Sequence, residues 1–183
     1  MTYDIVLAGF GGQGILFLGK IIATAGMIEG KEVSWIPSYG PEMRGGTANC
    51  SVVVSDKRIG TPVVSRPNVL VAMNRPSLEK FERKMAEGGF LLINRTLIEI
   101  PHTRTDIEVA YIGITGIAGG LGNPRLANVV ALGALIARVP IVGRDSAMAA
   151  LRKELSGKKA ALLDLNIAAL DAGLQATAPT VVS

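Results

Sequence analysis

The segment that decides the fold is Gly9-Phe10-Gly11-Gly12-Gln13-Gly14. The run before it, Tyr3–Ala8, is apolar and rich in aliphatic residues, which predicts a buried strand. The segment after it, Gly14–Ile28, repeats apolar residues at helical spacing and predicts a helix. Glycines at positions 9, 11 and 14 fit the pattern G-x-G-x-x-G, which permits a tight turn whose N–H groups attract an anion.

Strands and helices alternate along the rest of the chain. Further strands are predicted at Glu32–Pro37, Thr47–Ser55, Asn68–Met73, Phe90–Asn94 and Ile107–Tyr111. A strand at Ile59–Val64 is expected to pair back on Thr47–Ser55 as an antiparallel hairpin. Helices are predicted at Pro76–Glu87, Pro124–Val139, Asp145–Leu155 and Lys158–Gln175.

This alternation predicts the fold class: an α/β, Rossmann-like three-layer sandwich with a mostly parallel sheet and the appended antiparallel hairpin. The first strand, helix and second strand read as a βαβ unit with parallel strands. Without a long linker or an internal repeat, the chain reads as one domain over residues 1–183, with a frayed tail from about residue 176.

The composition excludes several classes of chemistry. Among 183 residues there is one cysteine, Cys50, and one histidine, His102, too few for an internal disulfide, an iron–sulfur cluster or a zinc site. The net charge of +4 comes from scattered basic pairs without interleaved aromatic residues, which argues against nucleic-acid binding. The chain shows no signal peptide and no apolar stretch long enough to span a membrane, so we expect a cytoplasmic protein.

The glycine pattern fits a dinucleotide such as NAD or FAD, and it also fits another ligand with a diphosphate or anionic group. A nicotinamide or flavin enzyme needs an acidic residue near the end of the second strand to hold the ribose. That position reads Val33-Ser34-Trp35-Ile36-Pro37-Ser38, without an acid, and Glu32 stands at the wrong end of the strand. A free-standing dinucleotide-dependent oxidoreductase therefore stays only as the alternative hypothesis.

A second loop, Ser38-Tyr39-Gly40-Pro41-Glu42-Met43-Arg44-Gly45-Gly46, leaves the end of the second strand. Open parallel sheets bind ligands at this edge, so we expect the loop to lie beside the first glycine segment. Arg44, flanked by glycine, would present its guanidinium to a phosphate or a carboxylate. The alternative is a surface loop in which Arg44 pairs with Glu42.

Three other features have weaker functional interpretations. Gly113–Arg125 predicts either a backbone nest for anions or, as the favoured interpretation, a glycine-rich loop before the helix at Pro124, with Asn123 as the helix cap. Cys50 lies within an apolar strand and is interpreted as a buried, inert thiol. His102 follows Pro101 in a polar stretch and is interpreted as a loop residue rather than a base. No catalytic residue and no metal ligand is predicted.

Gly9-Phe10-Gly11-Gly12-Gln13-Gly14-Ile15, taken together with Tyr39–Asn49 and Gly122-Asn123-Pro124-Arg125, closely resembles the gamma subunit of 2-oxoacid:ferredoxin oxidoreductases, most of all the 2-oxoglutarate type. The resemblance extends to about Val139. It implies an enzyme that converts a 2-oxoacid and coenzyme A to acyl-CoA, carbon dioxide and reduced ferredoxin. It places thiamine diphosphate and iron–sulfur clusters on alpha, beta or delta subunits.

The resemblance assigns a role in handling CoA to the gamma subunit. By position it carries over to Gly11, Gly12, Gln13, Arg44, Gly45 and Gly46, and with the flanking Gly9, Gly14, Ser38 and Tyr39 these residues form the predicted cofactor-binding set. The apolar composition, 49% hydrophobic residues, predicts a surface buried against other subunits. We expect a hetero-oligomer in the cell and a homodimer in isolation. A non-catalytic assembly protein is the third hypothesis.

Overall fold

The computed structural model describes residues 1–38 and 47–176. Its six strands form one sheet in the order β2-β3-β1-β4-β5-β6. The strands are β1 (Thr2–Phe10), β2 (Glu32–Pro37), β3 (Thr47–Ser55), β4 (Val69–Ala72), β5 (Phe90–Asn94) and β6 (Glu108–Ile112). The pairs β1–β4, β4–β5 and β5–β6 are parallel, whereas β3 runs antiparallel to both of its neighbours, β1 and β2.

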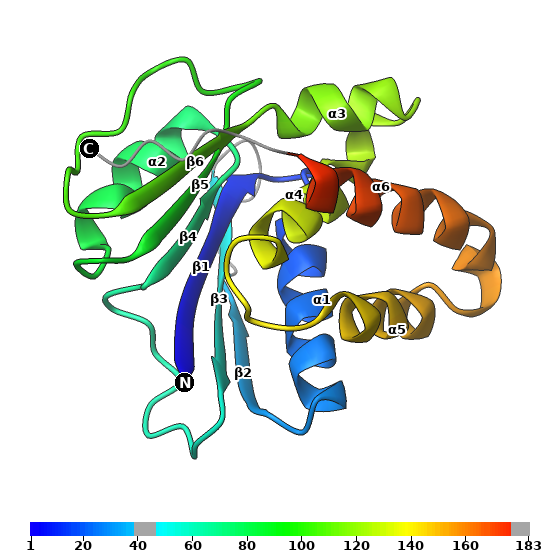
Figure 1. Cartoon of the computed structure of the whole chain (residues 1–183), viewed down its shortest axis with the longest axis horizontal. Helices are drawn as coiled ribbons and strands as arrows, with labels where there is room; N and C mark the ends of the chain where they lie inside the picture. Colours follow the sequence, from blue (N-terminus) through cyan, green and yellow to red (C-terminus); the bar gives the residue numbers. More distant parts are fainter. Residues whose placement is uncertain (39–46, 177–183) are drawn as a thin grey trace.

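Helices cover both faces of this sheet (Figure 1). The helical segments are α1 (Ile15–Ile28), α2 (Arg75–Phe81), η2 (Glu82–Lys84), α3 (Ile114–Gly120), η3 (Pro124–Leu126), α4 (Ala127–Ile136), α5 (Arg144–Glu154), η4 (Gly157–Leu162) and α6 (Leu163–Gln175). On one face, Ile5 and Leu7 of β1 join a large core with α1, α4, α5 and α6. On the other, Val6 and Ala8 join a smaller core with α2 and Ile98. The three predicted layers are therefore present.

The first βαβ unit differs from the expectation in one respect. Strands β1 and β2 do run parallel, because each is antiparallel to β3. They are not neighbours, however, since β3 lies between them and pairs Leu7 on one side and Pro37 on the other with its own Cys50. The antiparallel part of the sheet is thus the strand triplet β2-β3-β1.

Two element predictions were wrong. Ile59–Val64 is not a strand, because Gly60 and Pro62 interrupt it and proline has no N–H to donate to a ladder. The hairpin partner of β3 is β2 instead. The predicted loop Gly113–Gly122 contains helix α3, whose Ile114 and Ala118 are fully buried one turn apart. Burial of that apolar face outweighs the low helix propensity of glycine.

Most other boundaries agree within a few residues, although the predicted helix Pro76–Glu87 ends early as α2 and η2. The predicted helix Lys158–Gln175 divides into η4 and α6. Helix α4 crosses α6 with their backbones in direct contact. A Cβ on Gly133 would lie 2.1 Å from the Leu170 carbonyl oxygen, and one on Gly173 would lie 2.1 Å from that of Val130. This crossing holds α4 in place, and α4 in turn packs against α1.

Candidate anion site at the carboxyl edge of the sheet

The glycine segment closes into a tight turn between β1 and α1. The Gln13 N–H donates to the Phe10 carbonyl oxygen at 3.2 Å, and the Phe10 N–H donates to the Gln13 side-chain oxygen Oε1 at 2.6 Å. The Gln13 amide Nε2 lies 3.5 Å from the Met73 carbonyl oxygen at the end of β4. The predicted site residue Gln13 therefore holds the turn in shape through its side chain.

Three glycines of the turn are required for three different reasons. A Cβ on Gly9 would lie 2.5 Å from Gln13 Oε1, so this position has no room for a side chain. Gly14 adopts a left-handed φ of 72°, and its Cβ would lie 2.3 Å from the Asn128 amide nitrogen. Gly12 has a φ of 92° but no atom within 4 Å of its Cβ position, so it faces open space. Of these three, Gly12 is the one that leaves its backbone open to a ligand.

The start of α1 has the features of an anion site. Gly14 is its N-cap, makes no side-chain capping hydrogen bond, and accepts the Leu18 N–H on its carbonyl oxygen at 2.9 Å. The N–H groups of a first helical turn have no partner within the helix. The first turn of α1 contains no acidic residue that would compete for them. The positive end of the helix dipole adds to their attraction for a negative charge.

Asn128, in the first turn of α4, packs against the glycine turn and stabilises it. It is buried, with 6% of its surface exposed, and its amide nitrogen Nδ2 donates to the Gly14 carbonyl oxygen at 3.2 Å. Its side-chain oxygen accepts the Val129 N–H at 2.9 Å. The role of Asn128 was not predicted from the sequence. The available signal was a single amide in the otherwise apolar stretch Leu126–Ile136, a pattern that does not name the residue's partner.

The ends of the other parallel strands lie along the same edge. Asn94, the last residue of β5, donates from Nδ2 to Thr115 Oγ1 at 2.8 Å and accepts the Thr115 N–H at 3.2 Å, which ties the start of α3 to the sheet. Asn74, after β4, caps α2 by accepting the Ser77 N–H at 2.9 Å. Among the described residues the Asn74 amide nitrogen has no hydrogen-bond acceptor although the side chain is buried.

The second predicted loop begins and ends at this edge. Residues Tyr39, Arg44, Gly45 and Gly46 lie outside the described residues. Its flanking residues are described: the Ser38 N–H donates to the Asn49 carbonyl oxygen at 2.9 Å, and Thr47 pairs in register with Phe10 of the glycine turn. Both residues that flank the loop therefore lie at the edge that carries Gly9–Gly14, while the predicted position of the loop itself falls outside the described residues.

The third predicted feature, Gly113–Arg125, meets the site through its helices. The Asn123 side chain accepts the Arg125 N–H at 3.1 Å and caps η3, with Pro124 in its first turn, as predicted. Helix α4 follows directly and carries Asn128 to Gly14. The described backbone of this segment is mostly helical, which differs from the open glycine-rich loop that was expected.

The only cysteine and the only histidine of the sequence, Cys50 and His102, make structural contacts. Cys50 is fully buried, burial raises the pKa of its thiol to about 12, and its Sγ lies 3.6 Å from the Ile15 carbonyl oxygen. The predicted burial of this thiol is confirmed. The His102 N–H donates to the Tyr111 hydroxyl at 3.0 Å, and His102 Nδ1 lies 2.8 Å from the same oxygen.

Residues 1–38 and 47–176 contain neither a metal-binding cluster nor a membrane-spanning helix. No group of three or more His, Cys, Asp or Glu side chains is arranged to hold a metal ion. No helix in these ranges is both long and apolar enough to cross a membrane.

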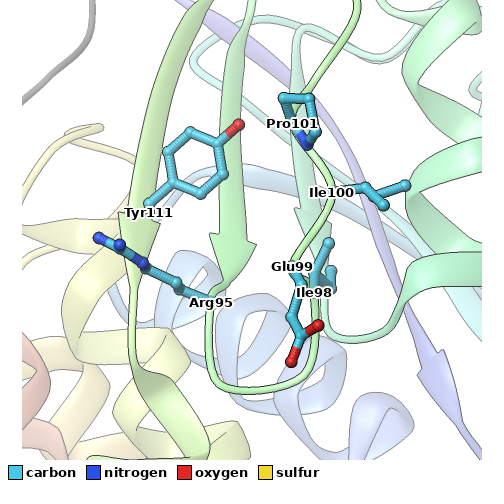
Figure 2. Close-up of a pocket in the computed structure, with 6 residues that line it drawn as sticks. All are labelled: Arg95, Ile98, Glu99, Ile100, Pro101 and Tyr111. Atoms are coloured by element: carbon cyan, nitrogen blue, oxygen red, sulfur yellow. The ribbon is translucent and has the colours of Figure 1, made fainter.

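A cavity of about 460 Å³ opens beside the ends of β5 and β6 (Figure 2). Its lining residues are Arg95, Ile98, Glu99, Ile100, Pro101 and Tyr111. Figure 2 shows the Tyr111 ring facing the segment that carries Pro101, with the Arg95 and Glu99 side chains pointing in different directions. Aliphatic groups and one aromatic ring thus form the walls, and the two charged groups stand at the margin.

The sheet, the glycine turn and the helix start together define an α/β domain with backbone N–H donors at the carboxyl edge of its sheet. The family model for pyruvate ferredoxin/flavodoxin oxidoreductase matches residues 4–176, and the chain belongs to this family.

Two curated relatives illustrate the range of the family. Ketoisovalerate oxidoreductase subunit VorA from Methanothermobacter thermautotrophicus is 39% identical over 173 residues, which cover 93% of this chain and 35% of that protein. 2-Oxoglutarate synthase subunit KorC from Methanocaldococcus jannaschii is 37% identical over 149 residues, 80% of each protein. The chain thus spans about a third of the length of VorA. The two identities do not separate a ketoisovalerate type from a 2-oxoglutarate type.

Two solved structures share the fold. The gamma subunit of keto/oxoacid ferredoxin oxidoreductase from Geobacter sulfurreducens PCA superposes with a TM-score of 0.84, 29% identity and 96% coverage of both chains. 2-Oxoglutarate:ferredoxin oxidoreductase from Magnetococcus marinus, with 2-oxoglutarate, coenzyme A and succinyl-CoA bound, gives a TM-score of 0.86 at 24% identity over 100% of this chain and 33% of that one. These likenesses confirm the predicted fold class.

Proposed function

We propose that this chain is the gamma subunit of a multi-subunit, thiamine-dependent 2-oxoacid:ferredoxin oxidoreductase, to which it contributes a CoA-facing domain. In the overall reaction the 2-oxoacid loses its carboxyl group as carbon dioxide, and its acyl group is transferred to the sulfur of CoA. The two electrons released reduce two ferredoxins. The proposal names the substrate as a 2-oxoacid, because relatives that act on different 2-oxoacids are about equally similar.

The observation that carries this proposal is the open glycine turn at the start of α1. Gly12 has no neighbour within 4 Å of its Cβ position, and Gly14 caps the helix without a side chain. A diphosphate group fits such a turn because it accepts several N–H hydrogen bonds and carries the charge that a helix start favours. CoA contains such a diphosphate, and the relative from Magnetococcus marinus was solved with CoA bound.

The proposed division of labour follows from the residues that this chain offers. Its single cysteine is buried in the core, and its described residues provide no group of metal-ligating side chains. They do not fit an iron–sulfur cluster, so we assign the clusters and thiamine diphosphate to alpha, beta or delta subunits. Ferredoxin then meets the assembled complex rather than this chain. We expect the complex in the cytoplasm, a reducing compartment that suits an unpaired thiol.

Three groups of residues then have different tasks toward CoA. Backbone N–H groups of Gly11 and Gly12 bind phosphate oxygens, while the side chains of Gln13 and Asn128 keep the turn in its binding shape. Arg44, Gly45 and Gly46, between the described residues Ser38 and Thr47, supply further phosphate contacts. A guanidinium binds phosphate through paired hydrogen bonds.

The alternative, a nicotinamide or flavin oxidoreductase, has less support. In a dinucleotide-binding fold the second strand lies beside the first and brings an acidic residue to the ribose. Here the neighbour of β1 on that side is the antiparallel β3, and β2 ends at Pro37 without an acid. Neither the sequence nor the strand order therefore provides an acidic residue to hold the ribose.

The test of the proposal is Gly12→Asp in the assembled complex. A carboxylate at this position repels a phosphate, so we expect the KM for CoA to rise by about tenfold or more, as for the loss of a hydrogen bond to a charged group, with kcat largely retained. Gly88→Asp is the matched control, because Gly88 also has a positive φ, 71°, and open space around its Cβ position. Gly88 stands before β5, at the opposite edge of the sheet.

An unchanged KM for CoA in Gly12→Asp would overturn the CoA-facing role. The subunit assignment is tested separately by purifying the tagged chain from native extract. We expect thiamine- and cluster-containing subunits to accompany it. The chain alone should not reduce a dye with a 2-oxoacid and CoA, and full activity of the isolated chain would contradict the proposal.

A further inference from the structure

The cavity beside Arg95 lies on the same edge of the sheet as the glycine turn. In the strand registers Ala8 pairs with Ala72, and Ala72 pairs with Ile93. Two residues further on, Phe10, Asn74 and Arg95 stand at the ends of three adjacent strands. Neighbouring strands are about 4.8 Å apart, so the backbones at Phe10 and Arg95 are separated by about 10 Å. A nucleoside diphosphate can bridge such a separation between its base and its terminal phosphate.

The walls of the cavity suit a flat, partly apolar group. Ile98 is almost fully buried, while Ile100 and Tyr111 are half-buried. The Tyr111 hydroxyl is held by both the backbone N–H and Nδ1 of His102, so the ring is fixed before any ligand arrives. A fixed aromatic ring beside a guanidinium offers stacking surfaces to a purine at little entropic cost. The volume of about 460 Å³ falls within the range of small-molecule sites.

Two polar groups at this edge, Arg95 and the Asn74 amide nitrogen, lack side-chain partners within the described part of the protein. Arg95 is exposed, and it forms no ion pair with any described residue, including the neighbouring Glu99. Between Arg95 and Phe10, the buried amide nitrogen of Asn74 has no hydrogen-bond acceptor. A buried donor without an acceptor is costly, and a free guanidinium binds phosphate well. Both groups therefore match a ligand that brings acceptor oxygens to this edge.

We propose that the cavity lined by Arg95 and Tyr111 binds the adenosine 3′-phosphate end of CoA, while the glycine turn binds its diphosphate. The adenine stacks against Tyr111, and Arg95 pairs with the 3′-phosphate. The inference rests on the proposed CoA-facing function and specifies the direction in which the nucleotide lies: over β4, β5 and β6. This direction also explains why the chain needs no acidic residue at the end of β2.

The test combines two variants with three acyl acceptors of decreasing length: CoA, dephospho-CoA and pantetheine. In the wild-type complex we expect the KM to rise along this series. Arg95→Ala should raise the KM for CoA by about tenfold, the worth of a hydrogen-bonded charge, and leave that for dephospho-CoA and pantetheine within about twofold. Arg75→Ala is the control, since Arg75 is an exposed arginine at the start of α2 that pairs with Glu79 at 2.8 Å.

A binding measurement accompanies the kinetics. By calorimetry, adenosine 3′,5′-bisphosphate should bind the wild-type and Arg75→Ala complexes and bind Arg95→Ala about tenfold more weakly. If Arg95→Ala still discriminates between CoA and dephospho-CoA as the wild type does, the proposal is wrong. Should Gly12→Asp then still raise the KM for CoA, the glycine turn keeps its role and only the cavity assignment falls. If neither variant affects CoA, the proposed function itself falls.

Discussion

The side-chain amide of Asn128 donates a hydrogen bond to the carbonyl oxygen of Gly14, at 3.2 Å, across 114 positions of the chain. The same amide nitrogen would lie 2.3 Å from a Cβ on Gly14. Helix α4 therefore approaches the glycine turn so closely that the turn tolerates only glycine at position 14. This contact links the glycine-rich start of the chain to the segment Gly122-Asn123-Pro124-Arg125, which precedes Asn128.

We expect Gly14→Ala and Asn128→Ala to be coupled. Gly14→Ala forces a side chain into a left-handed backbone and against Asn128, so it should lower the free energy of unfolding by about 2–4 kcal/mol. Asn128→Ala removes the obstacle, and the double variant should be more stable than the sum of the single effects by about 1 kcal/mol. Urea unfolding of the four proteins measures this. Strict additivity would show that the two residues do not interact.

The crossing of α4 and α6 predicts a large effect of a single methyl group. Because a Cβ on Gly173 would lie 2.1 Å from the Val130 carbonyl oxygen, Gly173→Ala must push the helices apart. We expect a loss of about 2–4 kcal/mol and a clear fall in Tm. Gly119→Ala is the control, because Gly119 lies in α3 with nothing near its Cβ position, and alanine there should stabilise by about 0.5–1 kcal/mol. Equal Tm values for both variants would contradict this.

The thiol of Cys50 should resist alkylation in the folded protein. Burial raises its pKa to about 12, so at pH 8 the reactive thiolate is very scarce. Iodoacetamide should modify the protein only in urea, as followed by mass spectrometry. The raised folded-state pKa also means that this residue's contribution to stability is complete below the unfolded pKa, about 8.5, and is lost as pH rises toward 12. Rapid labelling of folded protein would refute the buried position.

The ion pair between Arg144 and Asp171 connects α5 to α6. Arg144 donates from Nε and Nη2 to the two oxygens of Asp171 at 2.8 and 2.9 Å, and these bonds lower the pKa of the carboxyl group. Its stabilisation is therefore present above the unfolded pKa, about 3.9, and is lost as pH falls through the lower folded-state pKa.

Asp171→Asn should abolish that part of the acid dependence, with an effect of about 1 kcal/mol or less because the pair is partly exposed. Glu32→Gln, at an exposed carboxylate of β2 that forms no ion pair with any described residue, serves as the control. Urea midpoints between pH 2.5 and pH 6 measure both. Parallel curves for Asp171→Asn and the wild type would show that the pair contributes nothing.

Local pattern predicted the individual strands well and their arrangement poorly. Glu32–Pro37, Thr47–Ser55 and Phe90–Asn94 have the same boundaries in sequence and structure, because β-branched residues and turn signals act locally. The position of β3 between β1 and β2 depends on pairing between distant strands. The missed helix α3 depends on burial of Ile114 and Ala118 by the rest of the fold. Neither cause is present in the local sequence.

The candidate site was likewise predicted only in part. The glycines at 9, 11 and 14 predict a tight turn, and that turn is present, with a left-handed backbone at Gly12 and Gly14. Asn128 and the cavity at Arg95 were not predicted, because each becomes significant only through a residue brought to it by the fold. Single polar residues such as these occur on many helices and loops, and their spacing along the chain does not distinguish them.

The contact between Gly133 and Gly173 has a consequence for the order in which the protein is completed. During synthesis the glycine turn leaves the ribosome before Asn128, which follows more than a hundred residues later. Helix α4, which carries Asn128, is in turn fixed by α6, the last described helix. A nascent chain therefore exposes the glycine turn well before Asn128 can stabilise it, and the turn acquires its final shape only after α6 has been synthesised.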